Sequence, residues 1–151
     1  MQKVVELYTQ RRSMGQLADE FRVTPVNPEP PLVHFAFPVE IDALYAYAGG
    51  HNLMEYLPQF PHITSPASLL VATEHLSEEV ECELDFGWPF KITADCSIIL
   101  ALYTNYTIDE KMLIDEDQED AIRMVQEALR MDASVRPKWY FDVHDPWVPD
   151  E

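Results

Sequence analysis

Hydrophobic and acidic residues alternate without interruption from residue 79 to residue 86. Successive side chains of a β-strand point to opposite faces, so this pattern predicts a strand with one apolar and one acidic face. The apolar face would hold Val80, Cys82, Leu84 and Phe86, and the acidic face would hold Glu79, Glu81, Glu83 and Asp85. We expect the apolar side chains to be buried and the carboxylates to face either solvent or a partner.

The residues that follow predict a second strand paired with the first. Residues 87–89 are a candidate three-residue loop, which would place Phe86 opposite Phe90. Residues 98–103 are apolar at every position and predict an interior strand that continues from Phe90. The sequence therefore predicts an antiparallel sheet centred on residues 79–103.

Two segments carry apolar residues at helical spacing and predict amphipathic helices. The first covers residues 39–48, with Gly49-Gly50 as its expected C-terminal cap. The second covers residues 118–131, with an inward stripe of Ala121, Ile122, Val125, Ala128 and Leu129. A sheet with one apolar face packed against two or more helices is an α+β fold.

Other segments give shorter or ambiguous signals. Residues 32–37 alternate and predict a strand, and residues 138–147 predict a last edge strand. Residues 52–57 begin with a capping box and predict a short helical turn, followed by a proline-rich loop over 58–66. Residues 66–76 fit either a helix or a buried strand, because periodicity does not separate the two there.

Length and composition predict one acidic domain over residues 1–151. The chain has 151 residues, 47% of them hydrophobic, which is enough for a substantial core. Residues 2–11 and 13–21 are expected to form two short helices. Prolines then concentrate in residues 24–31, where we expect an extended connector inside the domain.

The charge balance restricts the classes of partner. The chain has 27 acidic and 10 basic residues, a net charge of −17, and only two of these net negative charges fall in residues 1–50. Such a field repels nucleic acids and anionic membranes and attracts basic proteins. We therefore expect a basic protein partner, no direct contact with nucleic acid and no membrane span. With no apolar leader, the sequence indicates an intracellular, cytoplasmic protein of unspecified oligomeric state.

No enzyme motif or metal-binding spacing is found in the sequence. The acidic run at 115–120 resembles the start of a calcium loop, but Asp120 and Gln126 stand where that loop needs glycine and glutamate. Asp142 and His144 would share a strand face and could act as an acid–base pair or as metal ligands. No other residues complete such a site, so we predict no catalytic residue, no metal and no cofactor.

Cysteines and tryptophans complete the candidate residues. Cys82 and Cys96 are expected to be buried, reduced thiols, with carboxylates beside them that raise a thiol pKa. Aromatic side chains are the strongest anchors for a partner or a pocket, so Trp88, Trp139 and Trp147 join the four carboxylates as candidate partner-binding residues.

Three functional hypotheses follow from these patterns. The first is a non-catalytic acidic interaction module that binds a basic partner, as an inhibitor, an immunity protein or a nucleic-acid mimic does. The alternative is a small-molecule-binding protein or an enzyme with an aromatic-lined pocket between helices and sheet. In the third, the acidic residues serve solubility alone.

Overall fold

The computed structural model describes residues 14–88 and 96–142. It has an α+β fold with a four-stranded antiparallel sheet in the order β4-β5-β1-β6. The strands are β1 (Val33–Val39), β4 (Asp85–Gly87), β5 (Ile98–Thr104) and β6 (Lys138–Phe141). β5 lies between β4 and β1, so the apolar run at 98–103 does form an interior strand. β6 lies at an edge, as predicted.

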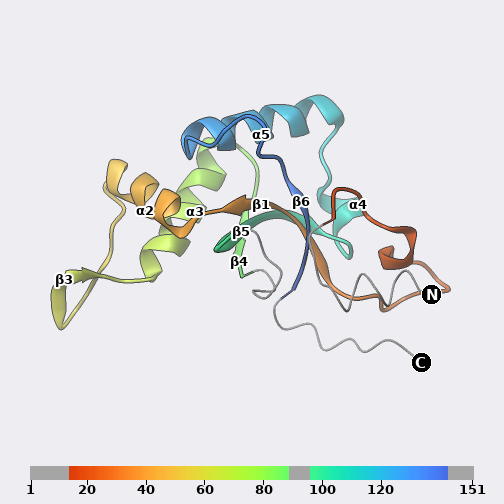
Figure 1. Cartoon of the computed structure of the whole chain (residues 1–151), viewed down its shortest axis with the longest axis horizontal. Coiled ribbons are helices and arrows are strands. Elements are labelled where there is room, and N and C mark those ends of the chain that lie inside the picture. The colour runs from red at the N-terminus through yellow and green to blue at the C-terminus, as the bar shows by residue number, and fades with distance from the viewer. Residues whose placement is uncertain (1–13, 89–95, 143–151) are drawn as a thin grey trace.

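Helices pack on one face of this sheet and around one end of it (Figure 1). α2 (Ile41–Gly50) and α5 (Asp115–Ala128) confirm the two predicted amphipathic helices, with bounds shifted by two or three residues. The stretch 66–76, left open by the sequence, is helical: Pro66 is the N-cap of α3 (Ala67–Glu79). Shorter helical segments are α4 (Ile108–Lys111) and the 3-10 turn η1 (Asp19–Phe21).

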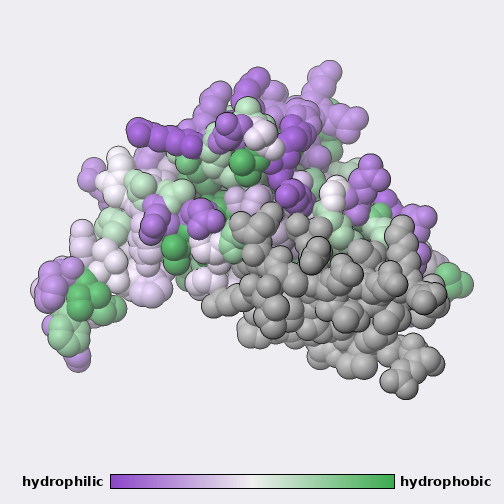
Figure 2. Space-filling model, viewed as in Figure 1, coloured by the Kyte–Doolittle hydropathy of each residue, from purple (hydrophilic) through white to green (hydrophobic). Residues whose placement is uncertain are grey.

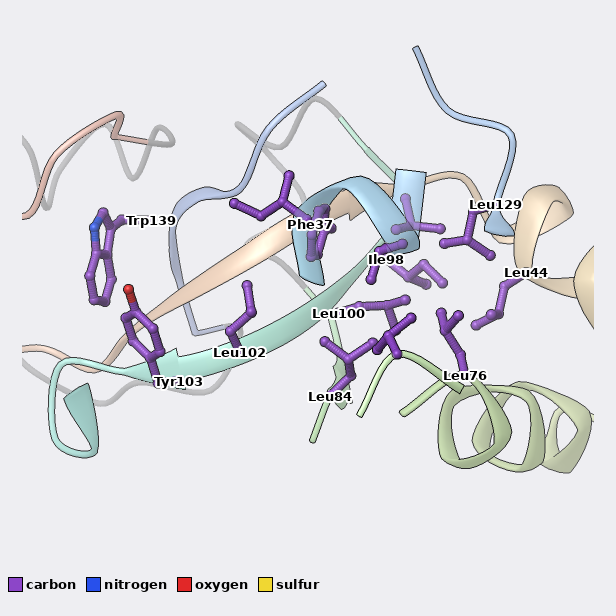
Figure 3. Close-up of a cluster of buried hydrophobic side chains, with 14 of the residues drawn as sticks. Phe37, Leu44, Leu76, Leu84, Ile98, Leu100, Leu102, Tyr103, Leu129 and Trp139 are labelled. Atoms are coloured by element: carbon purple, nitrogen blue, oxygen red, sulfur yellow. The ribbon is translucent and has the colours of Figure 1, made fainter. Parts of the chain in front are cut away.

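The main core lies between the sheet and these helices (Figure 3). Leu44 of α2, Leu76 of α3 and Leu129 after α5 gather around the strand residues Ile98 and Leu100. The pairing of β1 with β5 contains a bulge, because Phe35 pairs with Tyr103 and Ala36 pairs with Ala101. A bulge sets two residues of one strand against one of the other. Leu102 and Tyr103 consequently both belong to the main core.

The other face of the sheet holds a second, smaller buried cluster. Ala36, Ile99, Ala101 and Tyr140 are each at most 3% exposed, and Cys96 packs against them. Both faces of the two central strands are therefore buried, which explains why residues 98–103 are apolar at every position.

The segment before β1 is attached to the sheet by both backbone and side-chain contacts. Met14 and Trp139 exchange two backbone hydrogen bonds of 2.8 and 2.7 Å, and Phe21 is fully buried. The buried Asn105 amide donates to the carbonyls of Phe21 and Pro31, each at 2.8 Å, and its oxygen accepts from Val33 N–H at 3.1 Å. One side chain therefore links three positions that are 72 to 84 residues away in the sequence.

The helix predicted over 13–21 is wrong for its described part, where only η1 is helical and Met14 lies in a β-bridge. The proline-rich connector at 24–31 contains no named helix or strand, in line with the prediction. The helix predicted over 2–11 lies outside the described residues. The single-domain assignment of residues 1–151 stays a prediction.

The predicted strand over 79–86 is also wrong for most of its length. Glu79 is the last residue of α3, and only Asp85 and Phe86 of this stretch belong to a strand. Val80 follows Leu76 at a spacing of four residues, so the apolar position that fits a strand period also continues the helical stripe of α3. The expected exposure is present in part: Val80 and Leu84 are each 5% exposed and all four carboxylates are exposed, but Cys82 and Phe86 are only half-buried.

The predicted three-residue loop is not formed either. Phe86 pairs with Leu100 of β5, so the connection from β4 to β5 covers residues 88–97. Ser77 Oγ accepts a hydrogen bond of 3.0 Å from Leu84 N–H, which attaches the chain to α3 just before β4 begins. The proposed partner of Phe86, Phe90, lies outside the described residues.

Residues 56–64 form a hairpin, where a helical turn over 52–57 and a loop over 58–66 were predicted. β2 (Tyr56–Leu57) pairs with β3 (Phe60–Thr64), and the hairpin projects from the rest of the molecule (Figures 1 and 2). Every residue of β3 is exposed. The capping box fails because Asn52 adopts a left-handed φ of 59°, which a helix N-cap does not.

Asn52 belongs to a feature that α2, α3 and α5 share. The non-glycine residues with positive φ in the described ranges are Asn52, Glu81 and Arg130, and each lies two residues beyond the end of one helix. The next N–H bonds back in each case, from Leu53 to Ala48, from Cys82 to Ser77 and from Met131 to Gln126. This is the Schellman motif, in which glycine is the usual left-handed residue. Gly49-Gly50 instead lie inside α2.

Candidate functional site

The four predicted carboxylates belong to one turn rather than to one strand face. We call residues 79–85 the acidic turn. Glu79 ends α3, Glu81 occupies the left-handed position of the helix cap, and Glu83 and Asp85 lead into β4. These carboxylates do not share one surface: Glu83 and Asp85 line one hollow, and Glu81 lines another.

The first hollow is a groove between α3 and β4 of about 510 Å³, which we call the α3–β4 groove. Carboxylates enter it from Glu74 on α3 and from Glu83 and Asp85 of the acidic turn. Leu70, 59% exposed, and Phe86 add apolar surface. Trp88 is 40% exposed and contacts Phe86 edge to face with 5.3 Å between ring centroids. The groove thus combines three acids with accessible apolar side chains.

A lysine from α4 already contacts this groove. Lys111 Nζ lies 3.6 Å from Glu83 Oε2 and 3.8 Å from Asp85 Oδ2. Both carboxylate side chains are more than 60% exposed, so these ion pairs contribute little to stability. Their geometry shows that the two carboxylates converge closely enough for one ammonium group to contact both.

A second acidic hollow, of about 330 Å³, lies on the other side of the turn. It places Glu81 with Asp117 and Asp120 of α5, while Leu113 and Met124 contribute apolar surface. Arg123 Nη2 donates a hydrogen bond of 3.1 Å to Asp120 Oδ1. Figure 2 shows the hydrophilic character of the α5 edge, where exposed acids continue along the helix as Asp115, Glu116, Asp117, Glu119, Asp120 and Glu127.

The tryptophans lie in different environments. Trp139 is 4% exposed and packs against Phe35 and Tyr103, with ring centroids 5.2 and 5.8 Å away, so its side chain is part of the core (Figure 3). Trp88 contacts Phe86, which lines the α3–β4 groove. Trp147 lies outside the described residues. Of the three, Trp88 is therefore the one whose described position suits contact with a partner.

Comparison of the chain with protein-family models, curated proteins and solved structures gave no match. Within the described part of the chain, no helix combines the length and apolar character that a membrane span needs.

Both cysteines are half-buried and not disulfide-bonded. Burial raises the pKa of the Cys82 thiol, and the negative charge of Glu83 raises it further. The thiol is therefore held in its protonated form, as expected for a cysteine beside carboxylates and unlike an activated nucleophile.

Sequence patterns did not reveal two polar clusters, because their members are far apart in the chain. The Tyr47 hydroxyl lies 2.7 Å from His75 Nδ1, and the His51 ring packs on both of these residues. Burial, with the charge of Glu79 in second place, raises the pKa of Tyr47. Tyr47 belongs to α2 and His75 to α3, so their contact joins these two helices.

The second cluster pairs His34 of β1 with Asp142, their Nε2 and Oδ1 atoms 2.7 Å apart. The predicted partner of Asp142 was His144, which lies outside the described residues. Among residues 14–88 and 96–142, no group of three or more His, Cys, Asp or Glu side chains is arranged to hold a metal ion.

Proposed function

We propose that this protein is a non-catalytic interaction module that binds a basic segment of a partner protein in the α3–β4 groove. The observation that carries the proposal is the convergence of Glu83 and Asp85 on one ammonium group beside exposed apolar side chains. A lysine or arginine of the partner would lay its aliphatic stem on Leu70 and Phe86 and direct its charge to the carboxylates.

The charge of the whole chain supports the same function. A net charge of −17 accelerates the approach of a basic protein, and this steering weakens as salt screens it. Apolar contacts in the groove then supply binding that salt does not remove. A protein of this kind would block the basic surface that it covers, as an inhibitor or nucleic-acid mimic does.

The experiment uses a short fluorescein-labelled peptide in which lysine and leucine alternate, titrated by fluorescence anisotropy. We expect binding at low salt that weakens at physiological salt, where the screening length falls to about 8 Å. The double variant Glu83→Lys/Asp85→Lys should weaken binding by about tenfold or more, since two attractive contacts become repulsive. Leu70→Ser should weaken it several-fold without the same dependence on salt.

Matched controls separate the groove from the bulk charge. Glu29→Lys/Glu127→Lys makes the same change in net charge at exposed positions outside the groove, and Met112→Ser removes an equally exposed apolar side chain. These variants should bind the peptide almost as the natural chain does. If both double variants lose the same binding affinity, the acidic residues have only a nonspecific or solubilising role. Unchanged binding in Glu83→Lys/Asp85→Lys would show that the groove is not the binding site.

A further inference from the structure

Basic residues gather around one cavity of this acidic protein. Six of the ten lysines and arginines lie in the described ranges, and Arg130, Arg136 and Lys138 all line one cavity of about 410 Å³. It is formed by the end of β1, the start of α2 and the segment that connects α5 to β6. It shares no lining residue with the α3–β4 groove.

The remaining wall of this cavity is largely apolar. Val39 at the end of β1 and Leu129, Met131 and Val135 of the segment between α5 and β6 contribute hydrocarbon surface. The volume lies within the range of about 300 to 1,000 Å³ that is usual for small-molecule sites. An apolar wall with a few charged groups at fixed positions is also the usual composition of such sites.

Arg130 is positioned by an unfavourable backbone conformation. Arg130 is the left-handed residue of the α5 cap, with a φ of 54°. Glycine adopts this conformation at a lower energetic cost than any residue with a Cβ. The guanidinium of Arg130 forms no ion pair or side-chain hydrogen bond within the described residues. The side chain also borders an adjacent hollow of about 420 Å³, so it lies between two accessible spaces. The cap thus fixes where the Arg130 side chain leaves the backbone, at a place where it lines the cavity.

Arg136 is held in place by a carboxylate of α5. Glu119 Oε1 accepts a hydrogen bond from Arg136, which lowers the pKa of Glu119 and raises that of Arg136. An arginine has five N–H donors in a rigid plane, so one acceptor leaves others for a second anion. Glu40 is the acid that lines the cavity, and its carboxylate accepts from Ser97 Oγ at 2.9 Å. Arg136 therefore shares its charge with Glu119, whereas no described carboxylate forms an ion pair with Arg130.

We propose that this cavity binds a small organic anion, a carboxylate or phosphate ester with an apolar body. Arg130 contacts the anionic group in the bidentate manner of guanidinium, and Arg136, which lines the same cavity, assists. The apolar body lies against Val39, Leu129 and Val135. This site is independent of the proposed interaction groove.

The test uses 8-anilinonaphthalene-1-sulfonate, a fluorescent probe with an anionic group on an apolar body. We expect saturable binding to the folded protein, and displacement by octanoate or octyl phosphate but not by octan-1-ol, which has the same chain without the charge. Tighter competition by octyl phosphate would assign the phosphate class, and tighter competition by octanoate the carboxylate class. Displacement by octan-1-ol as effective as that by both anions would overturn the proposal.

Arg130→Gly removes the guanidinium and also relieves the left-handed strain, so the variant should fold at least as stably as the natural chain. We expect its affinity for the probe to fall about tenfold or more. Glu81→Gly relieves the same strain in the equivalent cap of α3 and should leave probe binding unchanged. Equal binding in Arg130→Gly, or an equal loss in both glycine variants, would show that Arg130 does not hold the anion.

Discussion

Cys82 shows how the surroundings of one side chain set its chemistry. It lies half-buried just after α3, next in sequence to a carboxylate, and both burial and that charge disfavour the thiolate. A raised pKa means that less thiolate is present at any given pH. Because thiolate is the reactive form, Cys82 should be slow to react with alkylating reagents near neutral pH.

This prediction can be checked by measuring the rate of iodoacetamide alkylation against pH in a Cys96→Ser background. The pH at which Cys82 reaches half its maximal rate should lie above the value of about 8.5 for an ordinary thiol. Glu83→Gln should shift that midpoint downward, since it removes the second cause of the raised pKa. A midpoint at or below the ordinary value would contradict the assignment.

At the scale of elements, the C-termini of α2, α3 and α5 use the same cap with three different residues. Asparagine tolerates the left-handed conformation better than other non-glycine residues, so Asn52 carries little strain, whereas Glu81 and Arg130 carry more. The three caps therefore offer an internal comparison of the cost of a Cβ.

We expect Glu81→Gly to raise the free energy of unfolding by about 1 kcal/mol, and Asn52→Gly to raise it by a few tenths of that at most. For a chain of this length, about 1 kcal/mol corresponds to an increase in melting temperature of roughly 2–4 °C. Urea unfolding monitored by circular dichroism measures both variants. A Glu81→Gly variant no more stable than the natural chain would show that the cap is not strained.

Sequence patterns identified the elements whose periodicity has one interpretation. α5 and α2 were predicted from their apolar positions, and the uniformly apolar residues 98–103 were predicted as an interior strand, which is buried at every one of these positions. The stretch 79–86 was misassigned because Val80 fits a strand period with Cys82 and a helical period with Leu76. Local spacing does not decide between a strand and a helix at this position. The packing of α3 against α2 and the sheet decides it.

The candidate site was predictable only in part for a related reason. Exposure of the four carboxylates follows from local alternation, and the structure confirms it. The grouping of Glu83 and Asp85 with Glu74, Leu70 and Lys111 joins residues from α3, α4 and β4. Such a grouping depends on how elements pack, and no spacing along the chain encodes it. The left-handed conformation of Arg130 was not predicted either, because glycine is the usual sequence signal of such a cap and arginine is not.

At the scale of the whole molecule, charge is segregated. Acids cover α5 and the acidic turn, while half of the described basic residues surround one cavity between α2 and β6. A uniformly acidic surface would suffice for solubility. The two proposed sites, one for a cationic segment and one for a small anion, follow this segregation and can be tested separately.

Residues 14–21 are attached to the sheet by contacts that should persist when the chain is cut after them. Their contacts with Trp139, Phe141 and Asn105 do not depend on the connector at 24–31, where Val26 is 94% exposed. If a protease site inserted between Pro28 and Glu29 is cut, we expect the short fragment to remain bound and to co-elute with the rest in size-exclusion chromatography. Dissociation at once in native buffer would contradict this.

The intact connector then acts as a tether that sets a high effective concentration for a segment with its own affinity. Asn105→Ala, which leaves the buried Val33 N–H and two carbonyls without this partner, should promote release of the cut fragment. Supplied separately, the same fragment should restore the cut protein as its concentration rises, so the chain can be divided into two pieces that reassemble without a peptide bond between them.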